Sequence, residues 1–159
     1  MLIKDCMSKG AVWCTPEMDV QAVAALMKKN NVGFLPVLQD SDSRHLMGVI
    51  TDRDICMKVV APGYDPRFSA VREVMTPSVA FCRQADPARQ ALDTMREKHI
   101  RRVPVVDATN RLVGVVSIED LVRGSEISSD KICTALRTIF QGSKRISSSP
   151  PRREKTRAS

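Results

Sequence analysis

The sequence has few aromatic residues, only two histidines and no long hydrophobic run. Phe, Trp and Tyr make up 4% of the 159 residues while hydrophobic residues make up 43%, so the core must be aliphatic. No stretch reaches the roughly 20 apolar residues that a membrane-spanning helix needs. Residues 1–5 also lack the apolar segment of a secretory signal. We therefore expect a cytoplasmic protein that does not span a membrane.

The cysteines give no sign of a disulfide framework or a metal site. Five are present, and they form neither a Cys-x-x-Cys pair nor a cluster with histidine. Cys14 and Cys82 occupy matching places in the repeat described below, which favours small buried hydrophobic residues on equivalent strands over a redox or metal role. With no metal cluster and no nucleophile–base pair in the sequence, we expect no bound metal and no enzymatic activity.

The positive charge belongs mainly to the end of the chain. The formal net charge is +7, but from Lys144 onward there are six Lys/Arg and one Asp/Glu, a net of 6 − 1 = +5. The remainder therefore carries 7 − 5 = +2. A nucleic-acid-associated protein using this tail is an alternative function. The absence of interleaved aromatic residues and of a recognition motif argues against it.

One unit occurs twice. Gly48–Asp54 reads Gly-Val-Ile-Thr-Asp-Arg-Asp, and its counterpart Gly114–Asp120 reads Gly-Val-Val-Ser-Ile-Glu-Asp. Other matching segments, such as Leu35-Pro36-Val37 and Val103-Pro104-Val105, are separated by 103 − 35 = 68 positions, and the separation falls to 114 − 48 = 66 after the first proline strand. Each copy predicts the order strand, helix, two-stranded hairpin, helix, which is an α/β arrangement.

These elements divide the chain into five parts. An Asp86-Pro87 pair is expected to start the first helix of the second repeat. A further helix is predicted with Ile132, Leu136, Ile139 and Phe140 on one face. The expected boundaries are repeat 1 at 1–62, a linker at 63–67, repeat 2 at 68–124, the extra helix at 125–142 and a basic disordered tail at 143–159.

The repeated Thr51-x-x-Asp54 and Ser117-x-x-Asp120 have two interpretations. In a capping box, the hydroxyl and the carboxylate satisfy free N–H groups at the start of a helix. In a ligand site, the carboxylate instead accepts hydrogen bonds from two ribose hydroxyls, while the hydroxyl and helix N–H groups meet phosphate. Gly48 and Gly114 indicate that the backbone closely approaches another group.

The whole pattern resembles the cystathionine-β-synthase (CBS) domain, and two tandem copies resemble a Bateman module. The resemblance covers roughly residues 1–124, and Ile50–Ile55 with Val74–Pro77 is similar to small stand-alone bacterial CBS-pair proteins. It implies two βαββα units related by a pseudo-twofold axis, with their sheets packed together and the helices outside. It also implies clefts between the repeats that bind AMP, ADP, ATP or S-adenosylmethionine, and a homodimer.

The resemblance also implies roles for particular residues. Asp54 and Asp120 would bind ribose, and Thr51 and Ser117 would lie near phosphate. Arg101 and Arg102 would also reach phosphate, and we place them at the cleft of Thr51 and Asp54 because the repeats contribute across the pseudo-twofold axis. Gly33 and Phe34 replace these arginines in repeat 1, so the two sites should be unequal. The candidates for an apolar adenine wall are Val12, Cys14, Pro16, Val37, Val79, Phe81 and Val105.

The leading hypothesis is thus a non-catalytic regulatory module. It would bind an adenosyl ligand, without an obligatory cofactor, and signal to an unidentified protein partner through a conformational change. A structural dimer with vestigial ligand sites is the remaining alternative, and the two intact Ser/Thr-x-x-Asp pairs argue against it.

Overall fold

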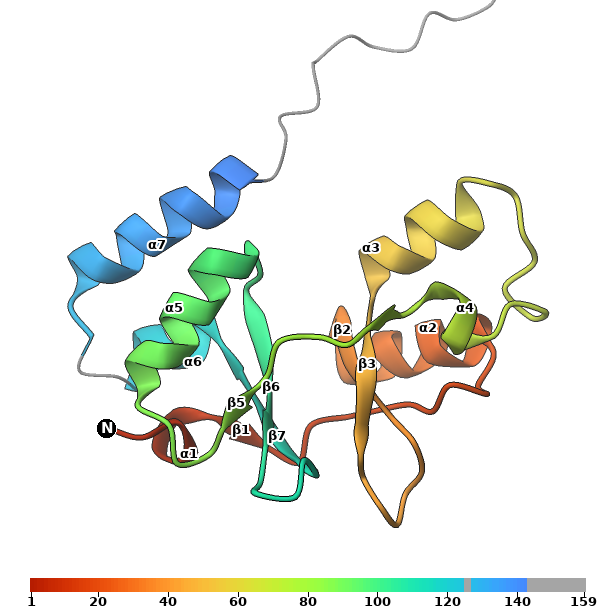
Figure 1. Cartoon of the computed structure of the whole chain (residues 1–159). Helices are drawn as coiled ribbons and strands as arrows, with labels where there is room; N and C mark the ends of the chain where they lie inside the picture. The colour runs from red at the N-terminus through yellow and green to blue at the C-terminus, as the bar shows by residue number, and fades with distance from the viewer. Residues whose placement is uncertain (125–126, 143–159) are drawn as a thin grey trace, which may run out of the picture.

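Two similar halves lie side by side, with their sheets toward each other and their helices outside (Figure 1). The structure is a computed structural model that describes residues 1–124 and 127–142. The basic tail predicted at 143–159 lies outside the described residues. The predicted α+β class is confirmed.

The first half contains the helix α2 (Val20–Asn30) and the hairpin of β2 (Phe34–Leu38) and β3 (Leu46–Thr51). The chain then passes directly into α3 (Asp52–Ile55), which continues as a π-helical turn at Cys56–Val60. Apolar residues at helical spacing in α2 and at alternating positions in the hairpin form one aliphatic core.

The second half repeats this order. It contains β5 (Cys82–Arg83), α5 (Ala88–Lys98), β6 (Arg102–Val106), β7 (Leu112–Ser117) and α6 (Ile118–Gly124). The hairpin of β6 and β7 has the same register as that of β2 and β3, including an irregularity at its last pair. The predicted hairpins are confirmed in both repeats.

The first segment of each repeat packs into the other repeat. At the N-terminus, α1 (Ile3–Cys6) is followed by β1 (Ser8–Lys9), which pairs with β7 of repeat 2. Between the repeats, α4 (Val71–Val74) is followed by β4 (Thr76–Pro77), which pairs with β3 of repeat 1. Ile3 belongs to the core of repeat 2, and Val71 and Val74 belong to that of repeat 1. The linker predicted at 63–67 therefore lies between the repeats in the sequence, but each core contains residues from both sides of it.

The same exchange supplies the starts of the long helices. The first N–H group of α5, at Ala88, donates to the carbonyl of Met1, and that of α2, at Val20, donates to the carbonyl of Ser69. The prediction that Asp86 caps α5 was wrong by one residue, because the residue at the cap position is Pro87 and the Asp86 carboxylate accepts from the backbone of Arg83. At α5, a segment distant in the sequence thus supplies the acceptor that a local side chain was expected to supply. Helix α2 also has a local cap, because Asp19 Oδ1 accepts from Ala22 N at 2.8 Å.

The two hairpin turns are joined by a symmetric pair of backbone hydrogen bonds. Leu46 N donates to Asn110 O at 3.4 Å, and Leu112 N donates to Arg44 O at 2.9 Å. Arg44 and Asn110 are equivalent residues, and both have a positive φ, of 51° and 62°. These bonds connect the repeats at the hairpin end of the sheets.

Helix α7 (Ser129–Gly142) breaks the symmetry by covering repeat 2, where it lies over α5 (Figure 1). Ile132, Ala135 and Ile139 enter the core of that repeat, and His99 Nδ1 lies 3.1 Å from the Thr138 carbonyl. The predicted extra helix is present. Phe140 was wrongly placed on its packed face, because it is 55% exposed and lies one residue beyond the buried stripe.

Truncating the packed face of α7 should cost much more stability than truncating its exposed neighbour. Ile139 is 2% exposed, so Ile139→Ala should lower the free energy of unfolding by about 2–5 kcal/mol. Phe140→Ala, the adjacent control, should change it by less than about 0.5 kcal/mol. Urea denaturation followed by circular dichroism measures both, and equal effects would show that α7 does not dock through this face.

Candidate functional site

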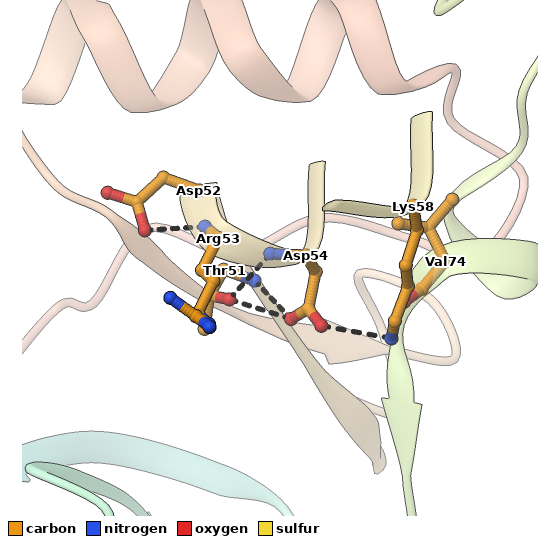
Figure 2. Close-up of polar contacts among 6 residues, drawn as sticks. All are labelled: Thr51, Asp52, Arg53, Asp54, Lys58 and Val74. Carbon is orange, nitrogen blue, oxygen red and sulfur yellow. Dashed lines mark hydrogen bonds and ion pairs between the residues drawn. The ribbon is translucent and has the colours of Figure 1, made fainter. Parts of the chain in front are cut away.

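Thr51 and Asp54 form a reciprocal capping box where β3 passes into α3 (Figure 2). Asp54 Oδ2 accepts from Thr51 N at 3.0 Å and from Thr51 Oγ1 at 2.7 Å. Asp54 N in turn donates to Thr51 Oγ1 at 3.1 Å. The carboxylate is therefore held in one orientation, with Oδ1 on the side away from Thr51.

The ammonium group of Lys58 contacts this second oxygen, Oδ1. This residue was not identified from the sequence. Its Nζ lies 2.9 Å from Asp54 Oδ1 and donates to the Val74 carbonyl at 2.7 Å, so the ammonium contacts both the carboxylate and a backbone carbonyl (Figure 2). The Lys58 side chain is 45% exposed and that of Asp54 is 17% exposed. The i, i+4 spacing to Asp54 was visible in the sequence. The contact with Val74 was not, because it depends on how α4 packs.

Ser117 and Asp120 repeat this geometry at the start of α6. Asp120 Oδ2 accepts from Ser117 N at 2.8 Å and from Ser117 Oγ at 2.6 Å, and Asp120 N donates to Ser117 Oγ at 3.1 Å. The remaining oxygen, Oδ1, accepts from Ser8 Oγ at 3.1 Å. Ser8 comes from β1, so the exchanged segment completes the site.

The capping-box interpretation is thus confirmed in both repeats. It is compatible with the second interpretation, in which the carboxylate binds ribose hydroxyls. An ionised carboxylate has about four acceptor positions. The hydrogen bonds and the ion pair above use three of them at Asp54 and three at Asp120. Each Oδ1 is held by a side chain, Lys58 or Ser8, that can rotate away. The hydroxyls of Thr51 and Ser117 already donate to carboxylates, so contact with phosphate would require them to turn.

Gly48 and Gly114 allow the close approach that the sequence indicated, and the approaching group is backbone. A Cβ on Gly114 would lie 2.6 Å from the Ser8 carbonyl oxygen, and one on Gly48 would overlap the Thr76 carbonyl oxygen. Both glycines therefore make space for the exchanged strands β1 and β4.

Arg102 lies directly opposite Ser117 in the register of β6 and β7, and its Nη2 is 3.9 Å from Glu119 Oε1. Arg101 is exposed, and its carbonyl accepts from Ile118 N. Among the described residues, no polar contact joins either arginine to Thr51 or Asp54. Figure 1 shows the start of β6 and the end of β3 on the same side of the paired sheets. The assignment of these arginines to the Asp54 cleft stays a prediction.

The candidates for the adenine wall fall into two groups. Cys14, Val37 and Val105 are 0% exposed and Pro16 is also buried, so in this structure they have no surface to offer a ligand. Burial raises the pKa of the Cys14 thiol to about 12 and also raises that of Cys82, which fits the interpretation of both as core residues. Val12, Val79 and Phe81 keep exposed surface.

The described residues also line two pockets. One, of about 400 Å³, is lined by Lys58, Tyr64, Phe68 and Val74 among others, and by none of the adenine-wall candidates. The other, of about 120 Å³, lies by the hairpin turns and is lined by Val79 and Phe81 among others. Neither of these two pockets is lined by Asp54 or Asp120.

Within residues 1–124 and 127–142, no group of three or more His, Cys, Asp or Glu side chains is arranged to hold a metal ion. The helices of this part of the chain are also too short or too polar to cross a bilayer.

Comparison with known proteins identifies the repeated unit. The pattern of the CBS domain matches residues 3–61 and 71–126, which are the two repeats. The chain belongs to the CBS domain family. The CBS domain-containing protein YhcV of Bacillus subtilis is 34% identical over 137 residues, which cover 86% of this chain and 94% of YhcV.

Two solved CBS structures carry ligands. The CBS domain pair of protein MJ0100 in complex with 5′-methylthioadenosine and S-adenosyl-L-methionine superimposes with a TM-score of 0.68 at 30% identity, covering 77% of this chain and 94% of that one. CBSX2 in complex with AMP superimposes with a TM-score of 0.65 at 27% identity, covering 77% and 93%. Structural neighbours of this CBS pair therefore bind adenosyl compounds.

A methyl group at Gly48 should destabilise the CBS pair by disturbing the contact between β3 and β4. Gly48→Ala should lower the free energy of unfolding by about 1–3 kcal/mol, because a carbonyl of the backbone cannot swing aside as a side chain can. Met47→Ala, at the adjacent exposed position of β3, should cost less than about 0.5 kcal/mol. Denaturant titrations measure both, and an unchanged Gly48→Ala midpoint would contradict the strand exchange.

Proposed function

We propose that this CBS pair is a non-catalytic sensor that binds an adenosyl ligand (AMP, ADP, ATP or S-adenosylmethionine) with Asp54 and Asp120 as its ribose-binding residues. One observation carries the proposal: both repeats hold a carboxylate in a fixed orientation, with one oxygen retained only by a side chain that can rotate away. The adenosyl compounds bound by its structural neighbours give the class of ligand.

The geometry suits a vicinal diol. Two neighbouring ribose hydroxyls are donors, and a carboxylate whose position is already fixed by backbone and hydroxyl contacts accepts them without losing further conformational entropy. The capping box therefore serves the site, because it orients the carboxylate before a ligand arrives.

The rest of the ligand would meet residues that the structure leaves accessible. Arg101 is exposed and Arg102 is held only by a long contact to Glu119, so both have donors for phosphate. Thr51 and Ser117 would assist by turning their hydroxyls from carboxylate to phosphate. Val12, Val79 and Phe81 are the remaining candidates for the adenine wall.

Ligand binding would be transmitted through the relative position of the repeats. The backbone bonds between the hairpin turns tie the repeats at one end, so a ligand at the other end would change the angle between them. Met57, Val60, Tyr64 and Phe68, all more than half exposed, offer an apolar surface for a second copy of the chain. The homodimer would then bias a protein partner in the cytoplasm.

Isothermal titration with AMP, ADP, ATP and S-adenosylmethionine tests this function. At least one should bind, and Asp54→Asn and Asp120→Asn should each weaken binding by about tenfold at the affected site, because the amide offers one acceptor where the carboxylate offers two oxygens. The double variant should bind none of them measurably.

Asp52→Asn is the matched control. Asp52 is exposed, lies in the same helix, and its carboxylate points away from Asp54 toward the Arg53 backbone (Figure 2). Its substitution should leave affinity unchanged. Binding that survives the double variant would contradict the proposed ribose role, and the absence of heat with all four compounds would contradict the function.

A further inference from the structure

The two carboxylates differ in the charge of the group that holds their second oxygen. An ammonium holds Asp54 Oδ1 at 2.9 Å, whereas a neutral hydroxyl holds Asp120 Oδ1 at 3.1 Å. Within the described residues, no ion pair reaches Asp120. The Ser/Thr-x-x-Asp motif therefore has a cation beside its carboxylate in repeat 1 and a neutral hydroxyl beside it in repeat 2.

Repeat 2 has no lysine at the position equivalent to Lys58. Asp54 and Asp120 are 120 − 54 = 66 positions apart, so the counterpart of Lys58 is Gly124. Helix α1 packs against this glycine, and a Cβ there would lie 3.2 Å from Cys6 Cβ. A side chain at this position would press on Cys6, and the glycine itself supplies no cation to Asp120.

We infer that Lys58 selects ligands by charge at the Asp54 site, favouring adenosyl ligands that carry a phosphate over neutral or cationic ones. This inference rests on the proposed function. A ribose diol that uses both oxygens of Asp54 must compete with the ammonium for Oδ1. A ligand with a phosphate offers the displaced ammonium a new anionic partner, and a neutral nucleoside offers none.

Lys58 has the freedom to make this exchange. Its side chain is nearly half exposed and lines the 400 Å³ pocket, so the ammonium can move without breaking into a packed core. Lysine presents three rotatable donors on a flexible four-carbon stem, so it can follow an anion while keeping the Val74 carbonyl within reach. A cationic sulfonium ligand would gain nothing at this site and would favour Asp120, where no ammonium has to be displaced.

The test compares AMP with adenosine, which differ only in the phosphate, in an Asp120→Asn background that isolates the Asp54 site. Lys58→Met keeps the volume of the stem and removes the charge. It should weaken AMP binding by about tenfold, the effect of one charge-assisted hydrogen bond. Adenosine binding should stay within about twofold or become tighter, because its competitor for Oδ1 is gone.

Two further variants separate charge selection from a structural role. Lys58→Arg keeps the cation and should restore the preference for AMP, and Lys29→Met, which removes an exposed charge from α2 of the same repeat, should leave both affinities unchanged. Equal changes for AMP and adenosine in Lys58→Met, or no change in either, would overturn the inference while leaving the function intact. If the parent protein binds neither AMP nor adenosine but binds ADP, ATP or S-adenosylmethionine, the inference fails in this form and the function stands. If it binds none of these compounds, both proposals fail.

Discussion

The close approach of backbone to backbone at Gly48 and Gly114 is the constraint on which the rest of the structure depends. Each glycine leaves space for a short strand from the first segment of the other repeat. Because those strands are anchored there, α1 and α4 enter the opposite cores and the first N–H groups of α2 and α5 find their acceptors. Neither repeat has a complete core without the other, which makes the pair the structural unit.

The same exchange builds the candidate sites. It brings Ser8 to Asp120 and brings the carbonyl of Val74 to the lysine that holds Asp54. The capping boxes are local and nearly identical, whereas the third partners differ in origin and charge: Lys58 comes from the next turn of the same helix, and Ser8 comes from β1. A structural role and a binding role for these carboxylates are therefore compatible, since the capping bonds fix one oxygen and the orientation of the other.

Much of the fold could be predicted from the sequence, because the sequence patterns that specify it are local and occur in both repeats. The hairpins follow from short apolar runs bounded by polar turns, and the starts of α3 and α6 follow from hydroxyl and carboxylate at capping spacing. The exposure of the residues proposed for the adenine wall was harder to predict. Pro16, Val37 and Val105 look the same in sequence as partly exposed strand residues, and only packing showed that they are buried. Phe140 failed for a related reason, since one residue of helical rotation separates it from the packed stripe.

By itself, the sequence determined that this is a tandem CBS pair with an aliphatic core, two capped carboxylates and one extra helix. These properties depend on spacing along a single segment, and repetition makes each one visible twice. Only the tertiary structure decided which segment completes which repeat, that the carbonyls of Met1 and Ser69 accept the first N–H groups of α5 and α2, and that Lys58 and Ser8 are the third partners. Apart from the i, i+4 pair of Asp54 and Lys58, those contacts join residues that are distant in sequence, so no local pattern encodes them.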